Sequence, residues 1–281
     1  MISTDNPIRQ AKDDLLSRSA IAEAFARQVL ELDATEGFVA GILGDWGSGK
    51  TSFINLARHG FENADVPVLD FNPWMFSGAE QLVASFFIEL AAQLKLRPDL
   101  VEVGTGLAEY GEAFSGLAWI PVVGPWAERI YSAAKVANKV LRRRSQGLGG
   151  KRAKLEEALL KLRRPIVVVL DDIDRLETKE IRDVFRLVRL TASLPSVIYL
   201  VAFDRKRVEN ALSEQGVLGR DYLEKILQLA FDLPTIPESL LTRQIPSAID
   251  DALAGIDNPG QLDGDVWPAY FAQSERLFRA I

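Results

Sequence analysis

Residues 38–51 read FVAGILGDWGSGKT, an apolar run that leads directly into a glycine-rich loop. The run from Phe38 to Leu43 is long enough for a buried strand. Gly44 to Thr51 fits the pattern Gly-x4-Gly-Lys-[Ser/Thr], and we expect a helix from Lys50 to Arg58, closed by Gly60. A glycine-rich loop between a strand and a helix indicates a phosphate-binding loop. The alternative is a glycine-rich turn that binds no ligand.

The residue types of this loop suit a nucleoside triphosphate. Gly47 and Gly49 allow backbone N–H groups to turn inward around an anion, and the helix that follows directs its positive dipole end at the same point. Lys50 is expected to reach the β and γ phosphates, and the Thr51 hydroxyl to bind Mg2+. We therefore expect ATP and Mg2+ as cofactors. The predicted binding residues are Gly44, Asp45, Trp46, Gly47, Ser48, Gly49, Lys50, Thr51 and Ser52.

Apolar strands alternate with amphipathic helices along most of the chain. The strands lack polar alternation, which is typical of a parallel sheet covered by helices on both faces, so the fold class is α/β. The predicted strands are 38–43, 66–71, 166–170, 197–203 and 229–233. The predicted helices are 19–32, 50–58, 77–94, 177–190 and 221–228, with a capping box between Ser77 and Glu80.

The clearest strand ends in acidic residues, in the sequence IVVVLDDIDRL at residues 166–176. Its carboxyl end lies at the same sheet edge as the glycine-rich loop. We expect Asp171 to coordinate Mg2+ through water and Asp172 to orient and deprotonate the attacking water. Because Asp172 stands where many such enzymes carry Glu, slow hydrolysis is an open alternative. A cluster favoured by the dipole of a helix N-terminus explains Asp174 equally well.

The fourth predicted strand ends in Phe203-Asp204-Arg205. If this strand lies between the loop strand and the acidic strand, its end faces the γ phosphate. Asp204 would then hold the water or sense the phosphate, and Arg205 would contact phosphate; the alternative is a helix cap by Asp204. Trp74, in FNPW after the second strand, is more typical of core or loop packing than of a ligand contact.

Composition excludes several classes of function. The chain has 281 residues, no Cys and one His, so thiolate zinc sites, Cys nucleophiles and multi-His metal sites are impossible, and a reducing, cytoplasmic compartment fits. His59 is expected at the surface. The net charge of −6 argues against general nucleic-acid binding. The longest uncharged run, between Glu112 and Glu128, has 15 residues, against the ~20 that span a bilayer.

Residues 98–150 break the strand–helix rhythm and are interpreted as an insertion into the α/β domain. Within them, 126–141 predicts a basic amphipathic helix that starts with Trp126. Such a helix suits peripheral contact with an anionic membrane surface through 126–144, at the inner face of the membrane. The alternative is a helix docked on its own domain with a solvated basic face.

Five ordered motifs together resemble the KAP P-loop NTPases. They are GDWGSGKT, FNPW, VVVLDDIDRL, YLVAFDR and YLEKILQLAFDLP, and the lead-in DNPIRQAKDDLLSR is also similar. The resemblance implies an additional-strand ATPase core with sheet order 5-1-4-3-2, followed by a helical lid. It also implies a link to membrane-associated signalling or phage exclusion. Many members carry transmembrane helices where this chain has 98–150, which is too short for a spanning pair.

These patterns predict a P-loop NTPase core at 1–237 and the start of a truncated C-terminal helical lid at 238–281. The expected function is an ATP-hydrolysing molecular switch that binds ATP or ADP and an unidentified protein partner. A scaffold stabilised by nucleotide but without turnover is the alternative. A P-loop kinase also stays open, whereas a GTPase is disfavoured because the guanine motif Asn-Lys-x-Asp is missing.

Overall fold

A computed structural model describes residues 6–76, 79–112, 114, 149–214 and 218–236. The chain divides into two compact units, one of Pro7–Thr235 and one of Met1–Asn6 with Ile236–Ile281. All helices and strands of the described residues lie in the first unit. The segments 126–141 and 238–281, the capping box at Ser77 and the membrane contact at 126–144 lie outside the described residues.

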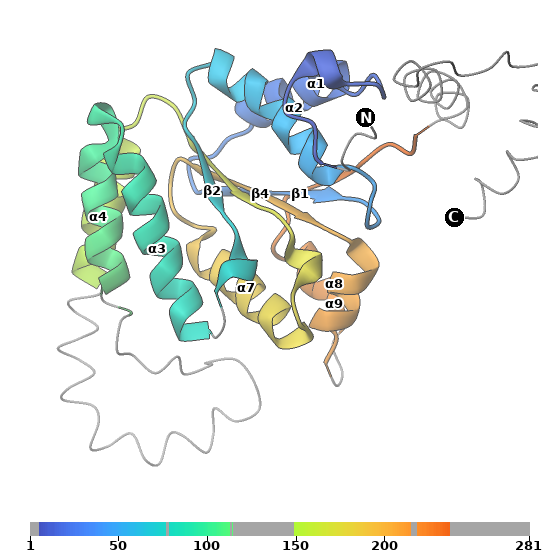
Figure 1. The fold of residues 1–281 in the computed structure, drawn as a ribbon. Coiled ribbons are helices and arrows are strands. Elements are labelled where there is room, and N and C mark those ends of the chain that lie inside the picture. Colours follow the sequence, from blue (N-terminus) through green and yellow to red (C-terminus); the bar gives the residue numbers. More distant parts are fainter. Residues whose placement is uncertain (1–5, 77–78, 113, 115–148, 215–217, 237–281) are drawn as a thin grey trace, which may run out of the picture. The chain divides into compact units, whose positions relative to one another are not determined.

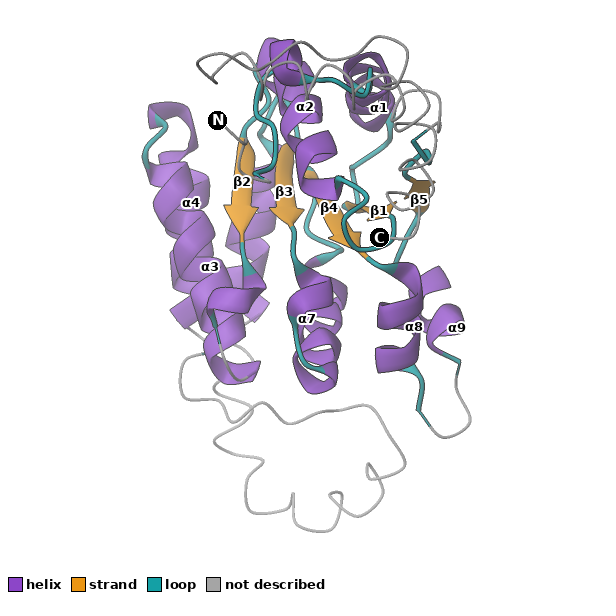
Figure 2. Cartoon of the chain, turned by 45° about the vertical axis from the view of Figure 1, so that its right-hand side comes forward, coloured by secondary structure: helices purple, strands orange, loops and turns teal. Residues whose placement is uncertain are grey.

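A five-stranded parallel sheet forms the centre of the Pro7–Thr235 unit. Its order is β2-β3-β4-β1-β5, which confirms the expected 5-1-4-3-2. Figure 2 shows β2, β3 and β4 side by side with their arrows pointing the same way. The strands are β1 (Phe38–Leu43), β2 (Val68–Phe71), β3 (Ile166–Leu170), β4 (Val197–Phe203) and β5 (Leu229–Asp232).

Two apolar cores, one on each face of the sheet, hold the unit together. Alternate residues of β3 and β4 point to opposite faces, and both strands are buried along their whole length. Figure 1 shows α1 and α2 on one side and α7, α8 and α9 on the other. The helices are α1 (Ser19–Glu31), α2 (Lys50–Asn63), α3 (Ala79–Lys95), α4 (Val101–Glu112), α7 (Thr178–Thr191), α8 (Arg205–Leu212) and α9 (Gly219–Glu224), and 149–160 is also helical.

The first part of the predicted insertion is packed into the core. Within 98–150, α4 lies against α3, and Tyr110 meets Phe87 edge-on with ring centroids 5.1 Å apart. The helix at 149–160 contributes Leu155 and Leu159 to the same core. The start of 98–150 and the helix that begins at its end are therefore structural parts of the α/β unit on the face that carries α3.

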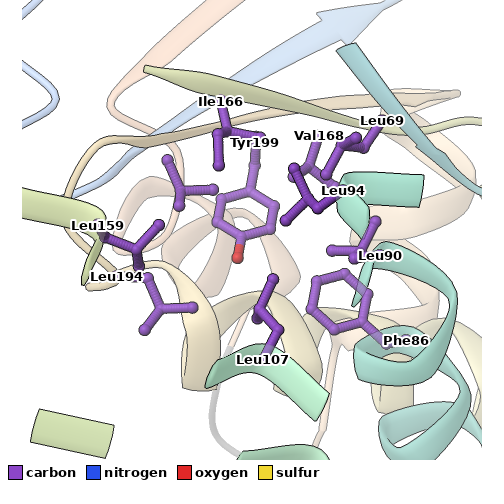
Figure 3. A pocket seen from close by; sticks show the side chains of 11 residues that line it. Leu69, Phe86, Leu90, Leu94, Leu107, Leu159, Ile166, Val168, Leu194 and Tyr199 are labelled. Atoms are coloured by element: carbon purple, nitrogen blue, oxygen red, sulfur yellow. The ribbon is translucent and has the colours of Figure 1, made fainter. Parts of the chain in front are cut away.

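A small cavity lies beside Tyr199 in this core, lined mostly by leucine side chains (Figure 3). Its volume of about 10 Å³ holds no more than one water molecule. The Tyr199 hydroxyl donates a long hydrogen bond of 3.4 Å to the carbonyl of Thr191, and burial raises its pKa. This cavity is therefore a packing gap in the core and is too small for a ligand.

Helix α2 runs past Gly60 to Asn63, so the expected end at Gly60 is wrong. The glycine serves packing instead. A Cβ at Gly60 would lie 2.6 Å from the Cβ of Ala26, which shows how closely α1 and α2 approach. Strand β2 also starts later than expected, at Val68, because the N–H of Val66 donates to the carbonyl of Phe61 and closes α2.

We expect Gly60→Ala to lower the free energy of unfolding by about 1 kcal/mol, measured by urea denaturation. Alanine favours a helix interior by ~1 kcal/mol, but the clash with Ala26 forces two packed helices apart, and overpacking costs ~1–3 kcal/mol. Gly106→Ala in α4 is the matched control, because its Cβ would meet Leu155 at an ordinary 3.5 Å. Equal effects of the two substitutions would contradict the packing role.

Candidate functional site

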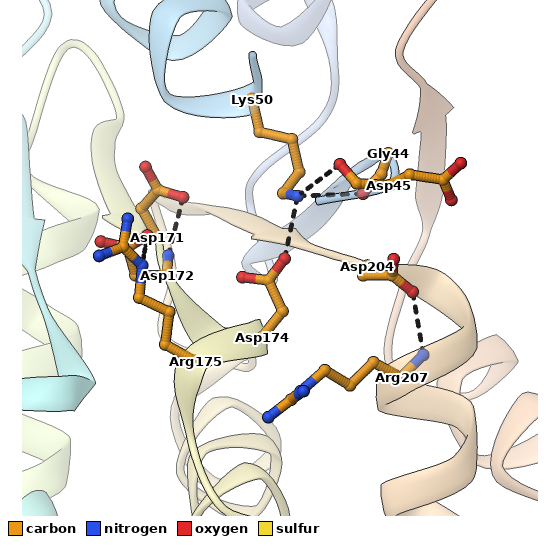
Figure 4. Close-up of polar contacts among 9 residues, drawn as sticks. All are labelled: Gly44, Asp45, Lys50, Asp171, Asp172, Asp174, Arg175, Asp204 and Arg207. Atoms are coloured by element: carbon orange, nitrogen blue, oxygen red, sulfur yellow. Dashed lines mark hydrogen bonds and ion pairs between the residues drawn. The ribbon is translucent and has the colours of Figure 1, made fainter. Parts of the chain in front are cut away.

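The carboxyl ends of the five parallel strands meet at one edge of the sheet. The glycine-rich loop follows β1, Asp171 follows β3 and Asp204 follows β4. Ligands of open parallel sheets bind at this edge. The order of strands puts the ends of β1 and β3 on either side of the end of β4, so the loop and the acidic residues face the same space (Figure 4).

The loop has the backbone of an anion cradle. Gly47 and Gly49 adopt φ values of +76° and +83°, which side chains rarely tolerate, and α2 begins at Lys50 directly after them. A Cβ at Gly44 would lie 2.5 Å from the hydroxyl oxygen of Ser48. The side chain of Trp46 is exposed at the outside of the loop.

The Lys50 ammonium group is buried at the centre of the site, with the residue only 7% exposed. Its Nζ donates to the carbonyl oxygens of Gly44 at 3.0 Å and Asp45 at 3.2 Å. Its third contact is an ion pair with Asp174, whose Oδ2 lies 3.0 Å away (Figure 4). The loop therefore holds a fixed positive charge where the sequence predicts the β and γ phosphates.

Thr51 and Asp171 are brought together by a hydrogen bond between their side chains. Burial raises the pKa of Asp171, and this outweighs hydrogen bonds from Thr51 and from the N–H of Asp172 that lower it. A buried carboxylate that is costly to ionise gains from a nearby cation.

These two side chains supply the hard oxygen ligands that Mg2+ prefers. Within the described ranges, no three His, Cys, Asp or Glu side chains gather into a group that would hold a metal ion alone. A hydroxyl and a carboxylate completed by water and phosphate oxygens fit the way Mg2+ is bound together with nucleotides. The residues present therefore fit Mg2+ at Thr51 and Asp171.

The remaining acidic residues of the motif point in different directions (Figure 4). Asp172 adopts a left-handed φ of +60°, and its carboxylate forms an ion pair of 2.8 Å with Arg175. Its side chain is 27% exposed, whereas that of Asp174 is 9% exposed and faces Lys50. The predicted base is thus turned toward a surface arginine, and Asp174, which resembled a helix-terminal charge, faces Lys50 instead.

Asp204 and Arg205 are engaged by neighbouring residues. Asp204 caps α8, accepting a hydrogen bond of 3.0 Å from the N–H of Arg207. Arg205 lies 3.5 Å from Asp232 and 3.8 Å from Glu209 in two ion pairs. The position of Asp204 thus agrees with the alternative interpretation of this residue as a helix cap.

Two other sequence interpretations have definite outcomes. Trp74 is 61% exposed, so core packing of this residue is wrong; its N–H donates to the side chain of Asn72 in a short turn. His59 is exposed near the end of α2, as expected, with its Nε2 3.1 Å from the carbonyl oxygen of Arg9.

Arg18 is a site residue that the sequence patterns did not single out. It is 6% exposed and donates to the carbonyl oxygens of Ser48 at 2.5 Å and Pro234 at 2.8 Å. Asp14 fixes the chain beside it by accepting hydrogen bonds from the N–H and hydroxyl of Ser19. Arg18 therefore fastens the glycine-rich loop to the chain that leaves β5.

Residues 18–261, most of the chain, match the family described as the KAP family P-loop domain. The chain belongs to the KAP family. A relative of this KAP chain is the Phage T7 exclusion protein of Escherichia coli (strain K12), 29% identical over 264 residues. The match covers 82% of this chain and 34% of that protein, so the chain spans about a third of the relative's length. Membership in a P-loop NTPase family supports nucleotide binding at Gly44–Thr51.

Solved structures similar to this KAP chain include two ORC proteins. Drosophila ORC bound to GC-rich DNA and Cdc6 matches with a TM-score of 0.46 and 12% identity, over 85% of this chain and 31% of that chain. The Aeropyrum pernix ORC1 protein in complex with DNA matches with a TM-score of 0.39 and 18% identity, over 97% and 56%. Both TM-scores lie below 0.5, so neither similarity bears on function.

A helix of this KAP chain would need roughly 20 mostly apolar residues to cross a bilayer. In the part of the chain that the structure describes, no helix is both long enough and apolar enough to cross a membrane.

We expect Arg18→Ala to lower the free energy of unfolding by roughly 2–3 kcal/mol and to weaken nucleotide binding. Two backbone carbonyls lose a charged donor, and the loop loses its anchor at Ser48. Urea denaturation and titration with ATP and Mg2+ measure the two effects. Arg27→Ala, at an exposed position of α1, the helix that Arg18 precedes, is the control and should change neither quantity. A fully stable Arg18→Ala protein would refute the anchoring role.

Proposed function

We propose that this chain binds ATP with Mg2+ at Gly44–Thr51 and hydrolyses the β–γ phosphate bond, acting as a molecular switch. The observation that carries the proposal is the buried Lys50 ammonium between the glycine-rich loop and the acidic end of β3. The hydrogen bond between Thr51 and Asp171 adds a place for the metal ion on the same edge.

Each group has a chemical role in this proposal. The N–H groups of the loop and of the first turn of α2 cradle the phosphates, and Lys50 neutralises the β and γ phosphate charge. Thr51 and Asp171 hold Mg2+, which when bound would offset the charge that builds up during phosphoryl transfer. Stabilisation of that charge supplies most of the catalysis in reactions of this class.

The water-orienting group comes from the acidic end of β3 or from Asp204. Asp172 is the residue that the sequence proposes, and it must first leave Arg175 to reach the phosphates. We also propose that Asp204 and Arg205 sense the γ phosphate. To contact it, Asp204 must release its helix cap and Arg205 its ion pairs.

The larger process that we propose is defence against phage. It rests on the name of the E. coli relative, a phage exclusion protein, of which this chain covers 34%. A protein partner and membrane contact through 126–144 are parts of the same proposal. So is the division into a core at 1–237 and a lid that starts at 238.

A scaffold that binds nucleotide without turnover is the second candidate. One observation favours it: both residues are already paired with neighbouring charges, Lys50 with the buried Asp174 and Asp172 with the exposed Arg175. The scaffold would bind ATP and release no phosphate. The switch releases phosphate in the presence of Mg2+ and stops when EDTA removes the metal ion.

We expect Lys50→Ala to weaken ATP binding by roughly 100-fold, because it removes the buried charge that faces the phosphates. The same substitution leaves Asp174 buried and unpaired, which costs ~3–5 kcal/mol of stability. The double variant Lys50→Ala/Asp174→Asn should therefore regain stability but not ATP binding. Calorimetric titration and thermal unfolding measure both quantities, and wild-type affinity in the single variant would rule out the site.

A further inference from the structure

Two carboxylates of the acidic motif compete for the place beside the reacting phosphate, and the structure separates them. Asp172 directly follows the residue that fits Mg2+, but its carboxylate is directed at Arg175 (Figure 4). Asp174 lies two residues further on, in the 3-10 turn Ile173–Arg175, and its carboxylate is directed at Lys50. The difference comes from the left-handed backbone at Asp172, which turns the chain at the end of β3.

The environment of Asp174 is that of a ligand-facing group. Oδ2 lies 3.0 Å from the Lys50 Nζ, yet the pair lacks the angles of a hydrogen bond, so the contact is an electrostatic one. Among the described residues, the buried side-chain polar atoms without a hydrogen-bond partner are this oxygen and the Ser48 hydroxyl oxygen. Both belong to the loop site, and buried polar atoms without a hydrogen bond call for a ligand or water.

We propose that Asp174, rather than Asp172, faces the γ phosphate and accepts the proton of the attacking water. This inference rests on the proposed hydrolysis. The water oxygen forms a bond to the γ phosphorus, and the bond from that phosphorus to the β–γ bridging oxygen breaks. The electron pair of the broken bond stays on ADP, the γ group leaves as inorganic phosphate, and one water proton goes to the Asp174 carboxylate.

The ion pair with Lys50 also gives Asp174 a role before the reaction. Its carboxylate neutralises the ammonium group that the triphosphate needs. An arriving γ phosphate takes over the ammonium group and releases the carboxylate toward the water. Since carboxylate and γ phosphate carry like charges, Asp174 weakens ATP binding more than ADP binding.

The test compares Asp174→Asn with Asp172→Asn, two substitutions of the same size on the same loop. For Asp174→Asn we expect phosphate release to slow by roughly 100-fold or more, the usual contribution of a general base. Its affinity for ATP relative to ADP should rise by about 10-fold, because a like charge is removed beside the γ phosphate. Asp172→Asn should slow phosphate release by less than about 10-fold, since its carboxylate pairs with an exposed arginine.

Steady-state phosphate release and calorimetric titration with ATP and ADP in Mg2+ provide the two readouts, and thermal unfolding verifies that each variant is folded. A larger loss of turnover in Asp172→Asn, or an unchanged ATP-to-ADP preference in Asp174→Asn, would overturn the inference. A purely structural Asp174 would instead lower stability and ATP affinity together. If wild type binds ATP but releases no phosphate, both the hydrolysis proposal and the role of Asp174 as a base fail. The ATP-to-ADP preference of Asp174→Asn then decides whether Asp174 faces the γ phosphate.

Discussion

The position of β4 between β1 and β3 is the constraint on which the site depends. Neighbouring strands lie about 4.8 Å apart, so an intervening strand separates the ends of β1 and β3 by roughly 10 Å. That gap suits a long lysine side chain from one strand end and an aspartate from the other, and Lys50 and Asp174 meet in it. All seven residues of β4 are buried, which holds the spacing rigid.

The two cores serve this edge in different ways. On one face, α1 and α2 pack closely through Gly60 and Ala26, and this fixes the direction of α2, whose first turn forms part of the loop site. On the other face, α7 follows the acidic turn, and its first residues are fixed by a capping box between Glu177 and Glu180. The glycine-rich loop thus leads into a helix anchored in one core, and the acidic turn leads into a helix anchored in the other.

Much of this arrangement could be read from the sequence. The bounds of β3 and β4 agree with the expectation because uninterrupted apolar runs have sharp ends. The pairing of Thr51 with Asp171 follows from two motifs that end on one sheet edge. The order of the strands was not visible in the patterns themselves and came from the family resemblance.

What the sequence did not predict has physical causes that differ from residue to residue. Glycine commonly ends a helix, but α2 continues through Gly60. Only a residue without a side chain lets α2 approach α1 so closely at this point. The sequence favoured Asp172 as the base from its place beside Asp171, and it could not show the φ angle at Asp172 that turns the Asp174 carboxylate toward Lys50. Arg18 was missed because its partners lie 30 and 216 residues away, beyond any local pattern.

The shared guanidinium of Arg18 has a mechanical consequence. Its two hydrogen bonds join the carbonyl of Ser48, in the loop, to that of Pro234, two residues before Ile236 and the second compact unit. Both bonds use one rigid planar group, so a displacement of Ser48 strains the contact at Pro234. The glycine-rich loop and the chain that leaves β5 are thus mechanically linked, so a force that displaces one of them is transmitted to the other.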